Sequence, residues 1–131
     1  MAVLIDTDLL IDWERAESAA SFEALVASED RAISVITVSE LLHGVHRASG
    51  ALRNQRRAFV EHLLAGFEAL PITEAIARVH ADVWSSLKRE GNVPGAHDLW
   101  IAATALAHGF GVATRNRGDF ERVQGLRVIA L

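Results

Sequence analysis

Four acidic residues stand at widely separated points of this chain, each at the edge of an apolar segment. Asp6 lies in VLIDTDLLI, Glu40 in VITVSELLHG, Asp98 in AHDLWIAATA and Asp119 in VATRNRGDF. A carboxylate beside a buried segment costs free energy unless it caps a helix or meets a cation. If folding brings these carboxylates together, they repel one another until a divalent metal ion neutralises them. The set therefore predicts a metal-dependent nuclease.

The residue types also indicate which metal and which chemistry to expect. Carboxylates are hard oxygen ligands, so the expected ion is Mg²⁺ or Mn²⁺. Such ions bind a phosphate oxygen, activate a bound water and stabilise the leaving 3′-oxygen, so no protein nucleophile is required. The chain has no cysteine, no serine nucleophile elbow and no glycine-rich phosphate loop. His43 and His46 lie one helical turn apart, but no third nitrogen or sulfur ligand for zinc is evident.

Each of the acids also has a purely structural explanation. Asp6 or Asp8 can cap the helix that follows, and residues 37–40 match a capping box. Asp98 stands where an N-cap residue belongs, and the last acid can fix a turn over residues 116–119. Capping roles give no reason for all of the acids to meet at one edge of the fold, whereas a shared metal ion does. The metal-site prediction therefore depends on convergence rather than on any single residue.

Composition indicates a single domain of 131 residues, of which 50% are hydrophobic. The lack of cysteine excludes a disulfide framework and a thiolate zinc site. The longest apolar run, residues 99–107, is shorter than the roughly 18 residues of a membrane span, and the N-terminus lacks a signal-peptide pattern. We expect a cytoplasmic protein without membrane association. The apolar excess favours burial of part of its surface against another chain.

The net charge of −4 argues against a general polyanion binder, but the distribution of basic residues is more informative. Of the 13 basic residues only Lys88 is a lysine, and the arginines cluster in two regions. Planar guanidinium groups suit bidentate phosphate contacts, although the clusters also fit an ordinary solvated helix face. The candidate RNA-contacting residues are Arg53, Arg56, Arg57 and Arg115.

The pattern of apolar segments predicts strands that alternate with helices. We expect strands over residues 2–5, 32–36, 67–72, 111–114 and 126–131. We expect one or two helices over residues 9–27, with Ser18 or Ser21 as a cap, and further helices over 37–48, 52–64 and 98–107. Another amphipathic helix starts at residues 73–74 and has apolar positions from Ile76 to Leu87. A loop separates the last two helices, and a turn follows the fourth strand. Short strands separated by helices are typical of a parallel sheet with helices on both faces.

Parallel sheets of this kind bind ligands at the carboxyl ends of their strands. Asp6 follows the first strand, Glu40 lies in the helix after the second, and Asp119 follows the fourth. Asp98 joins them only if its helix begins at the same edge and runs antiparallel to the strands. We therefore expect all of these acids at the carboxyl edge of the sheet.

Two other residue types near these motifs have open roles. His97 precedes Asp98 and can contact a phosphate or tune the aspartate, or it can be ordinary loop surface. For Trp13, Trp84 and Trp100 we expect packing in the core or at an interface rather than base stacking.

These segments, in this order and spacing, resemble the PIN-domain ribonucleases, and within them the VapC toxins of type II toxin–antitoxin systems. The resemblance extends over the whole chain through LIDTDLLI, SELLHG, HDLWIAATA and ATRNRGDF. Its more specific parts are DLWIAA and the pattern of Thr114, Asn116, Asp119 and Phe120. It implies one PIN domain over residues 1–131, a three-layer α/β/α sandwich with a central parallel sheet of about five short strands. It also implies a homodimer and Mg²⁺- or Mn²⁺-dependent cleavage of RNA.

Carried over by position, the resemblance also implies roles for individual residues. The acidic centre would consist of Asp6, Glu40, Asp98 and Asp119, with Asp6 and Asp98 as direct metal ligands. Thr114 and Asn116 would support this centre, and Asp8 would lie at its periphery. A cognate antitoxin would fill the groove and place a basic side chain among the carboxylates.

Other protein classes remain possible at this stage. A PIN nuclease that is not a toxin, or a catalytically silent RNA- or protein-binding module, would keep the same fold, although the complete acid set favours an enzyme. A receiver-like signalling domain needs a phosphoacceptor aspartate after its third strand and a lysine near its fifth. The segment FEALPITEA has no aspartate, and Lys88 lies within a predicted helix.

Overall fold

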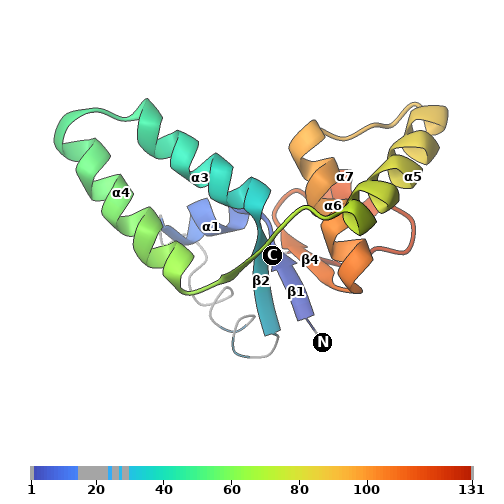
Figure 1. The fold of residues 1–131 in the computed structure, drawn as a ribbon, viewed down its shortest axis with the longest axis horizontal. Coiled ribbons are helices and arrows are strands. Elements are labelled where there is room, and N and C mark those ends of the chain that lie inside the picture. Colours follow the sequence, from blue (N-terminus) through green and yellow to red (C-terminus); the bar gives the residue numbers. More distant parts are fainter. Residues whose placement is uncertain (1, 15–23, 25–26, 28–29, 131) are drawn as a thin grey trace.

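The computed structural model describes residues 2–14, 24, 27 and 30–130 (Figure 1). The strands are β1 (Ala2–Ile5), β2 (Asp30–Ser34), β3 (Glu68–Leu70), β4 (Gly111–Thr114) and β5 (Val128–Ala130). The helices are α1 (Thr7–Glu14), α3 (Val35–Arg47), α4 (Gly50–Ala65), α5 (Glu74–Glu90), α6 (Ala96–His108) and α7 (Arg117–Glu121). Most of the region 15–27, including Ser18 and Ser21, lies outside the described residues.

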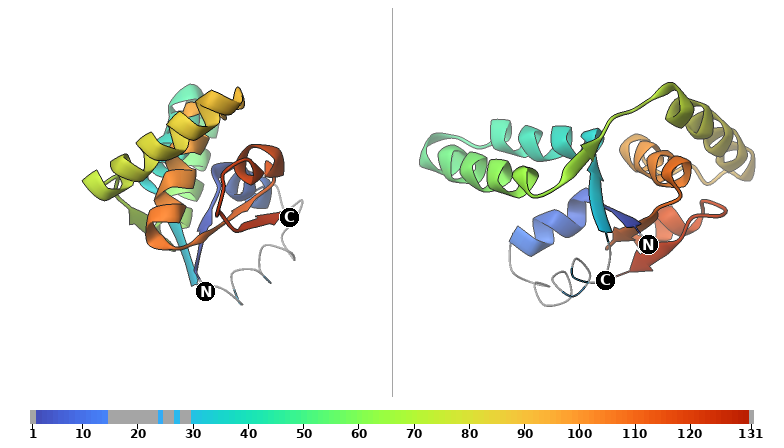
Figure 2. Two further views of the ribbon diagram at one scale, coloured as in Figure 1. Left: turned by 90° about the vertical axis from the view of Figure 1, so that its right-hand side faces the viewer. Right: turned by 60° about the horizontal axis from the view of Figure 1, so that its bottom comes forward.

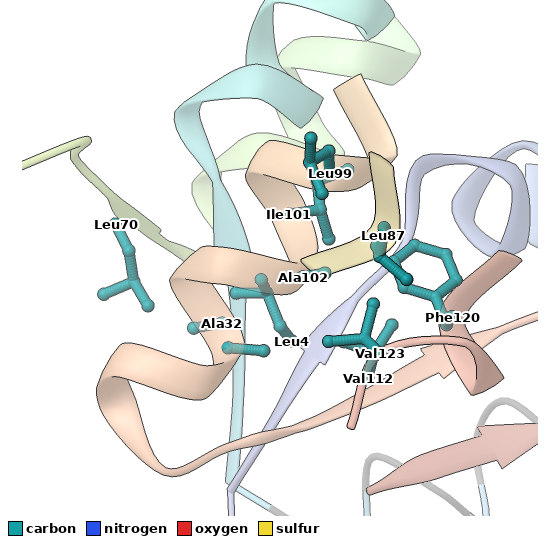
Figure 3. Close-up of a cluster of buried hydrophobic side chains, with 11 residues drawn as sticks. Leu4, Ala32, Leu70, Leu87, Leu99, Ile101, Ala102, Val112, Phe120 and Val123 are labelled. Atoms are coloured by element: carbon teal, nitrogen blue, oxygen red, sulfur yellow. The ribbon is translucent and has the colours of Figure 1, made fainter. Parts of the chain in front are cut away.

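All neighbouring strands pair in parallel, in the order β3-β2-β1-β4-β5. Side chains of β1 alternate between the two faces of the sheet. Val3 and Ile5 pack with α1, α3 and α4, whereas Leu4 packs with α5, α6 and α7. Figures 1 and 2 show these helices on opposite sides of the sheet, and Figure 3 shows the core around Leu4. The predicted three-layer α/β/α sandwich with a parallel sheet is confirmed.

The strand order fixes where a cleft can form. The chain leaves β1 toward β2 and β3 on one side, and β4 and β5 lie on the other side. The order therefore reverses between β1 and β4, and ligands of open parallel sheets bind outside the carboxyl ends of the strands at such a switch point. In the register of these two strands Ile5 pairs with Ala113, so the residues that follow are neighbours at this edge.

Four helices begin two residues earlier than predicted, and the earlier starts of α3 and α6 have consequences for two of the acids. α3 begins at Val35 because the Ser34 hydroxyl accepts a hydrogen bond from the Ile36 amide at 3.0 Å. The capping box proposed for residues 37–40 is therefore wrong. α6 begins at Ala96 after Gly95, so Asp98 is not the N-cap residue. Neither Glu40 nor Asp98 is used to cap its helix.

Smaller differences concern a turn, three boundaries and a tryptophan. Residues 117–121 form α7 instead of a turn, and α4 begins at Gly50 rather than at residue 52. β3 and β5 are shorter than predicted. Trp84 is 48% exposed, so a core role is wrong for this residue. No helix in the described part of the chain is long and apolar enough to cross a membrane.

Candidate active site

Asp6 lies at the switch point, directly after the central strand. The Thr114 hydroxyl donates to its Oδ2 at 2.7 Å, and the Thr7 amide donates to its Oδ1 at 2.8 Å. The second contact satisfies an amide in the first turn of α1, so Asp6 also has part of the capping role considered for it. Its side chain is buried, with only 2% of the residue exposed. A carboxylate so deeply buried needs a reason beyond capping.

Asn116 connects two further acids to this position. Its Nδ2 donates to Asp98 Oδ2 at 3.2 Å and to Asp119 Oδ2 at 3.0 Å. The Asn116 amide donates to the Thr114 hydroxyl at 2.8 Å, and that hydroxyl donates to Asp6. A continuous series of hydrogen bonds thus joins the ends of β1 and β4 to the first turns of α6 and α7.

Glu40 is held from two sides. The Thr7 hydroxyl, which lies 3.0 Å from the Thr37 hydroxyl, donates to Glu40 Oε1 at 2.7 Å. His97 Nδ1 lies 3.3 Å from the other carboxylate oxygen, Oε2. His97 therefore contacts Glu40 rather than the neighbouring Asp98. Sequence reasoning missed Thr7 in this role, and its one available signal was its position beside Asp6.

The remaining acid considered from the sequence, Asp8, lies in the first turn of α1 and lines a groove that also contains Glu40 and His97. Burial raises the pKa of Asp8, and the charges of Glu40 and Asp12 raise it further. The peripheral role of Asp8 in the acidic centre stays a prediction.

The surroundings of the acidic centre favour the protonated, neutral form of its carboxyl groups. Burial raises the pKa of Asp6 from 3.8 to about 7; Thr114 opposes this change and the charge of Asp98 adds to it. Burial, together with repulsion from Asp119, Glu40 and Asp8, raises the pKa of Asp98 from 3.8 to about 6. A divalent cation would reverse both effects because it favours the ionised carboxylates.

The ligand chemistry fits such a cation, but a complete coordination shell is not preformed. Among the described residues, no group of three or more His, Cys, Asp or Glu side chains is placed to hold a metal ion. Instead, Thr7, Thr114 and Asn116 hold individual carboxylate oxygens. The zinc site considered at His43 and His46 likewise has no ligand group within this part of the chain. The clustered charges and oxygen donors of Asp6, Asp98 and Asp119 nevertheless fit a hard cation at the acidic centre.

The raised pKa of Asp6 predicts a pH-dependent stability of the metal-free protein. The folded state binds the Asp6 proton more tightly than the unfolded state, so stability falls as pH rises from 3.8 to about 7 and is level above that. Between pH 5 and 7.5 the loss due to Asp6 should be on the order of 2 kcal/mol. Urea unfolding in EDTA measures it by comparing the wild type with Asp6→Asn. Parallel pH profiles for the two proteins would contradict this expectation.

The predicted RNA-contacting arginines have diverse surroundings. Arg53 donates to the carbonyls of Ala48 at 2.7 Å and His46 at 3.2 Å, at the end of α3. Arg115 pairs with Asp12 of α1 at 3.0 Å. Arg56 and Arg57 lie on α4. Arg53 and Arg115 thus make contacts within the protein. RNA contact by the four arginines stays a prediction.

Comparison with known proteins now identifies the family. The model of the PIN domain family matches residues 3–126. The chain is 33% identical to Ribonuclease VapC1 of Rickettsia felis, over 100% of this chain and 97% of that protein. It is 33% identical to Toxin FitB of Neisseria gonorrhoeae, over 90% of each chain. The crystal structure of FitAcB from Neisseria gonorrhoeae superposes with a TM-score of 0.84 at 30% identity, covering 97% of this chain and 96% of that one. This chain is therefore a member of the PIN-domain family and belongs, within it, to the VapC proteins.

Proposed function

We propose that this protein is a Mg²⁺- or Mn²⁺-dependent endoribonuclease and the toxin of a toxin–antitoxin pair. The observation that carries the proposal is the junction at the switch point, where Asn116 and Thr114 link Asp6, Asp98 and Asp119. The names of the relatives from Rickettsia felis and Neisseria gonorrhoeae, a ribonuclease and a toxin, support the same function.

The residues would divide the work between binding and positioning. Asp6 and Asp98 would hold the metal ion, which supplies activation of water and of the phosphate when it is bound. Asn116 keeps Asp98 and Asp119 oriented toward one position, because its single amide donates to both. Glu40 keeps unused lone pairs on both carboxylate oxygens, so it can accept a proton from water while Thr7 and His97 fix its orientation.

The same proposal includes partners. We expect action in the cytoplasm, where RNA and an antitoxin meet the protein. The antitoxin would place an arginine or lysine near Asp98, because a cation there offsets carboxylate repulsion. A homodimer would cover exposed apolar residues such as Trp84, which packs on the ring of His80. Sedimentation velocity at micromolar concentration distinguishes this dimer from a monomer.

Metal dependence tests the proposed chemistry. Purified protein treated with EDTA should not cleave RNA extracted from growing bacteria, and added Mg²⁺ or Mn²⁺ should restore cleavage. The physical reason is that the unneutralised carboxylates repel the phosphate and activate no water. Mapping of new RNA ends by sequencing is the measurement. Equal cleavage in EDTA and in metal would contradict the proposed mechanism.

A further inference from the structure

A groove leads away from the acidic centre between α3 and α1, and the proposed chemistry does not use its far end. Its volume is about 470 Å³, within the range of sites that bind ligands. The lining residues include Asp8, Ile11, Glu40, His43, Arg47 and His97. Glu40 and His97 belong to the acidic centre, so the groove is continuous with it.

The residues of α3 that line this groove form a stripe along which the side-chain charge changes. Glu40, His43 and Arg47 are spaced by three and four residues, which places them on one face of the helix. At a rise of 1.5 Å per residue, His43 lies about 4.5 Å and Arg47 about 10.5 Å beyond Glu40 along the axis. The charge therefore changes along the groove from acidic beside the metal centre to basic at the far end.

Unlike several other arginines, Arg47 has no partner among the residues that the structure describes. Arg78, Arg117 and Arg122 pair with Glu74, Glu121 and Asp119, and Arg53 and Arg115 are held by contacts described above. Within residues 2–14 and 30–130, no hydrogen bond or ion pair engages Arg47, and its side chain is exposed. In a protein of net charge −4, this leaves a guanidinium group available to an anion in the groove.

We infer that the far end of this groove is a subsite for the RNA backbone, where Arg47 and His43 bind a phosphate near the scissile one. The inference rests on the proposed function and adds the path of the substrate to it. An RNA strand whose scissile phosphate lies at the acidic centre would carry a neighbouring phosphate along α3. A planar guanidinium binds a phosphate through two parallel hydrogen bonds. Such a contact positions the strand and reads no sequence.

The test compares Arg47→Glu with Arg89→Glu. Arg89 is an exposed residue in the last turn of α5, so both variants change the net charge equally. Initial rates are measured with RNA extracted from growing bacteria, in Mg²⁺, over a salt series. Arg47→Glu should raise KM at least about tenfold, leave kcat within about twofold, and reduce the salt slope by about one. Arg47→Lys should recover part of the loss, and Arg89→Glu should change KM by less than about twofold.

The possible contrary results are distinct. If all variants cleave RNA and Arg47→Glu has the same KM and salt slope as Arg89→Glu, the subsite is wrong and the nuclease remains. If Arg47→Glu alters only inhibition by the antitoxin, the groove end contacts protein and the RNA subsite is overturned. If the wild type cleaves no RNA in Mg²⁺, both proposals fall. Circular dichroism checks folding, and Arg47→Gln replaces the charge reversal if that variant is unfolded.

Discussion

Asp98→Asn should reduce metal-dependent RNA cleavage by about a thousandfold while the fold is retained. Asparagine keeps the size of the side chain and an oxygen that can accept from Asn116, but it removes the charge that holds the cation. The metal-free variant should also melt at a higher temperature than the wild type, because Asp119, Glu40 and Asp8 no longer repel an ionised neighbour. Cleavage rates and thermal melts in EDTA measure the two effects.

The matched control for this prediction is Asp82→Asn. Asp82 is an exposed aspartate of α5 outside the acidic centre, and the same change of charge there should leave cleavage within about twofold. Loss of activity in both variants would indicate a general effect of charge. Normal cleavage by Asp98→Asn would remove Asp98 from the set of metal ligands.

Expression of the protein alone should arrest bacterial growth. Glu40 and Asp119 keep 30% and 29% of their side chains exposed, and no segment among the described residues closes over them. Restraint of cleavage would therefore come from the antitoxin. Asp6→Ala should abolish the arrest, and co-expression of the protein encoded beside this one should suppress it. Growth curves together with the integrity of total RNA measure the effect.

A different outcome of the expression experiment separates the remaining alternatives. Unimpaired growth with intact RNA, combined with cleavage in vitro, would indicate a PIN nuclease that is not a toxin. Unimpaired growth without cleavage in vitro would favour the catalytically silent binding module. Arrest by the Asp6→Ala variant as well would show that toxicity does not depend on the acidic centre.

The architecture was predictable because its signals are local. The runs AVLI and GVA are apolar, as expected for strands covered on both faces, and helices separate them. The parallel arrangement then directs the ends of β1 and β4 to one edge of the sheet. Asp6 and Thr114 are therefore neighbours as a consequence of topology, although 108 residues separate them in the sequence.

Details that depend on competition between caps or on distant side chains were not predictable. Ser34 and Thr37 are both acceptable N-caps, and the end of β2 selects the first. The contacts of Glu40 with Thr7 and His97 join three elements and leave no local pattern. The arginine cluster likewise gave no indication that Arg53 turns back to α3 while Arg47 lines the groove.

The central position of β1 has a consequence for the order in which the protein becomes active during its own synthesis. β1 is translated well before its partner β4 and before Asn116 and Asp119. Pairing between such distant segments forms late, because a large loop must close before the contact is gained. Asp6 and Glu40 are thus present on the nascent chain before the residues that complete the centre have been made. The acidic centre therefore stays incomplete until Asp119 has been translated.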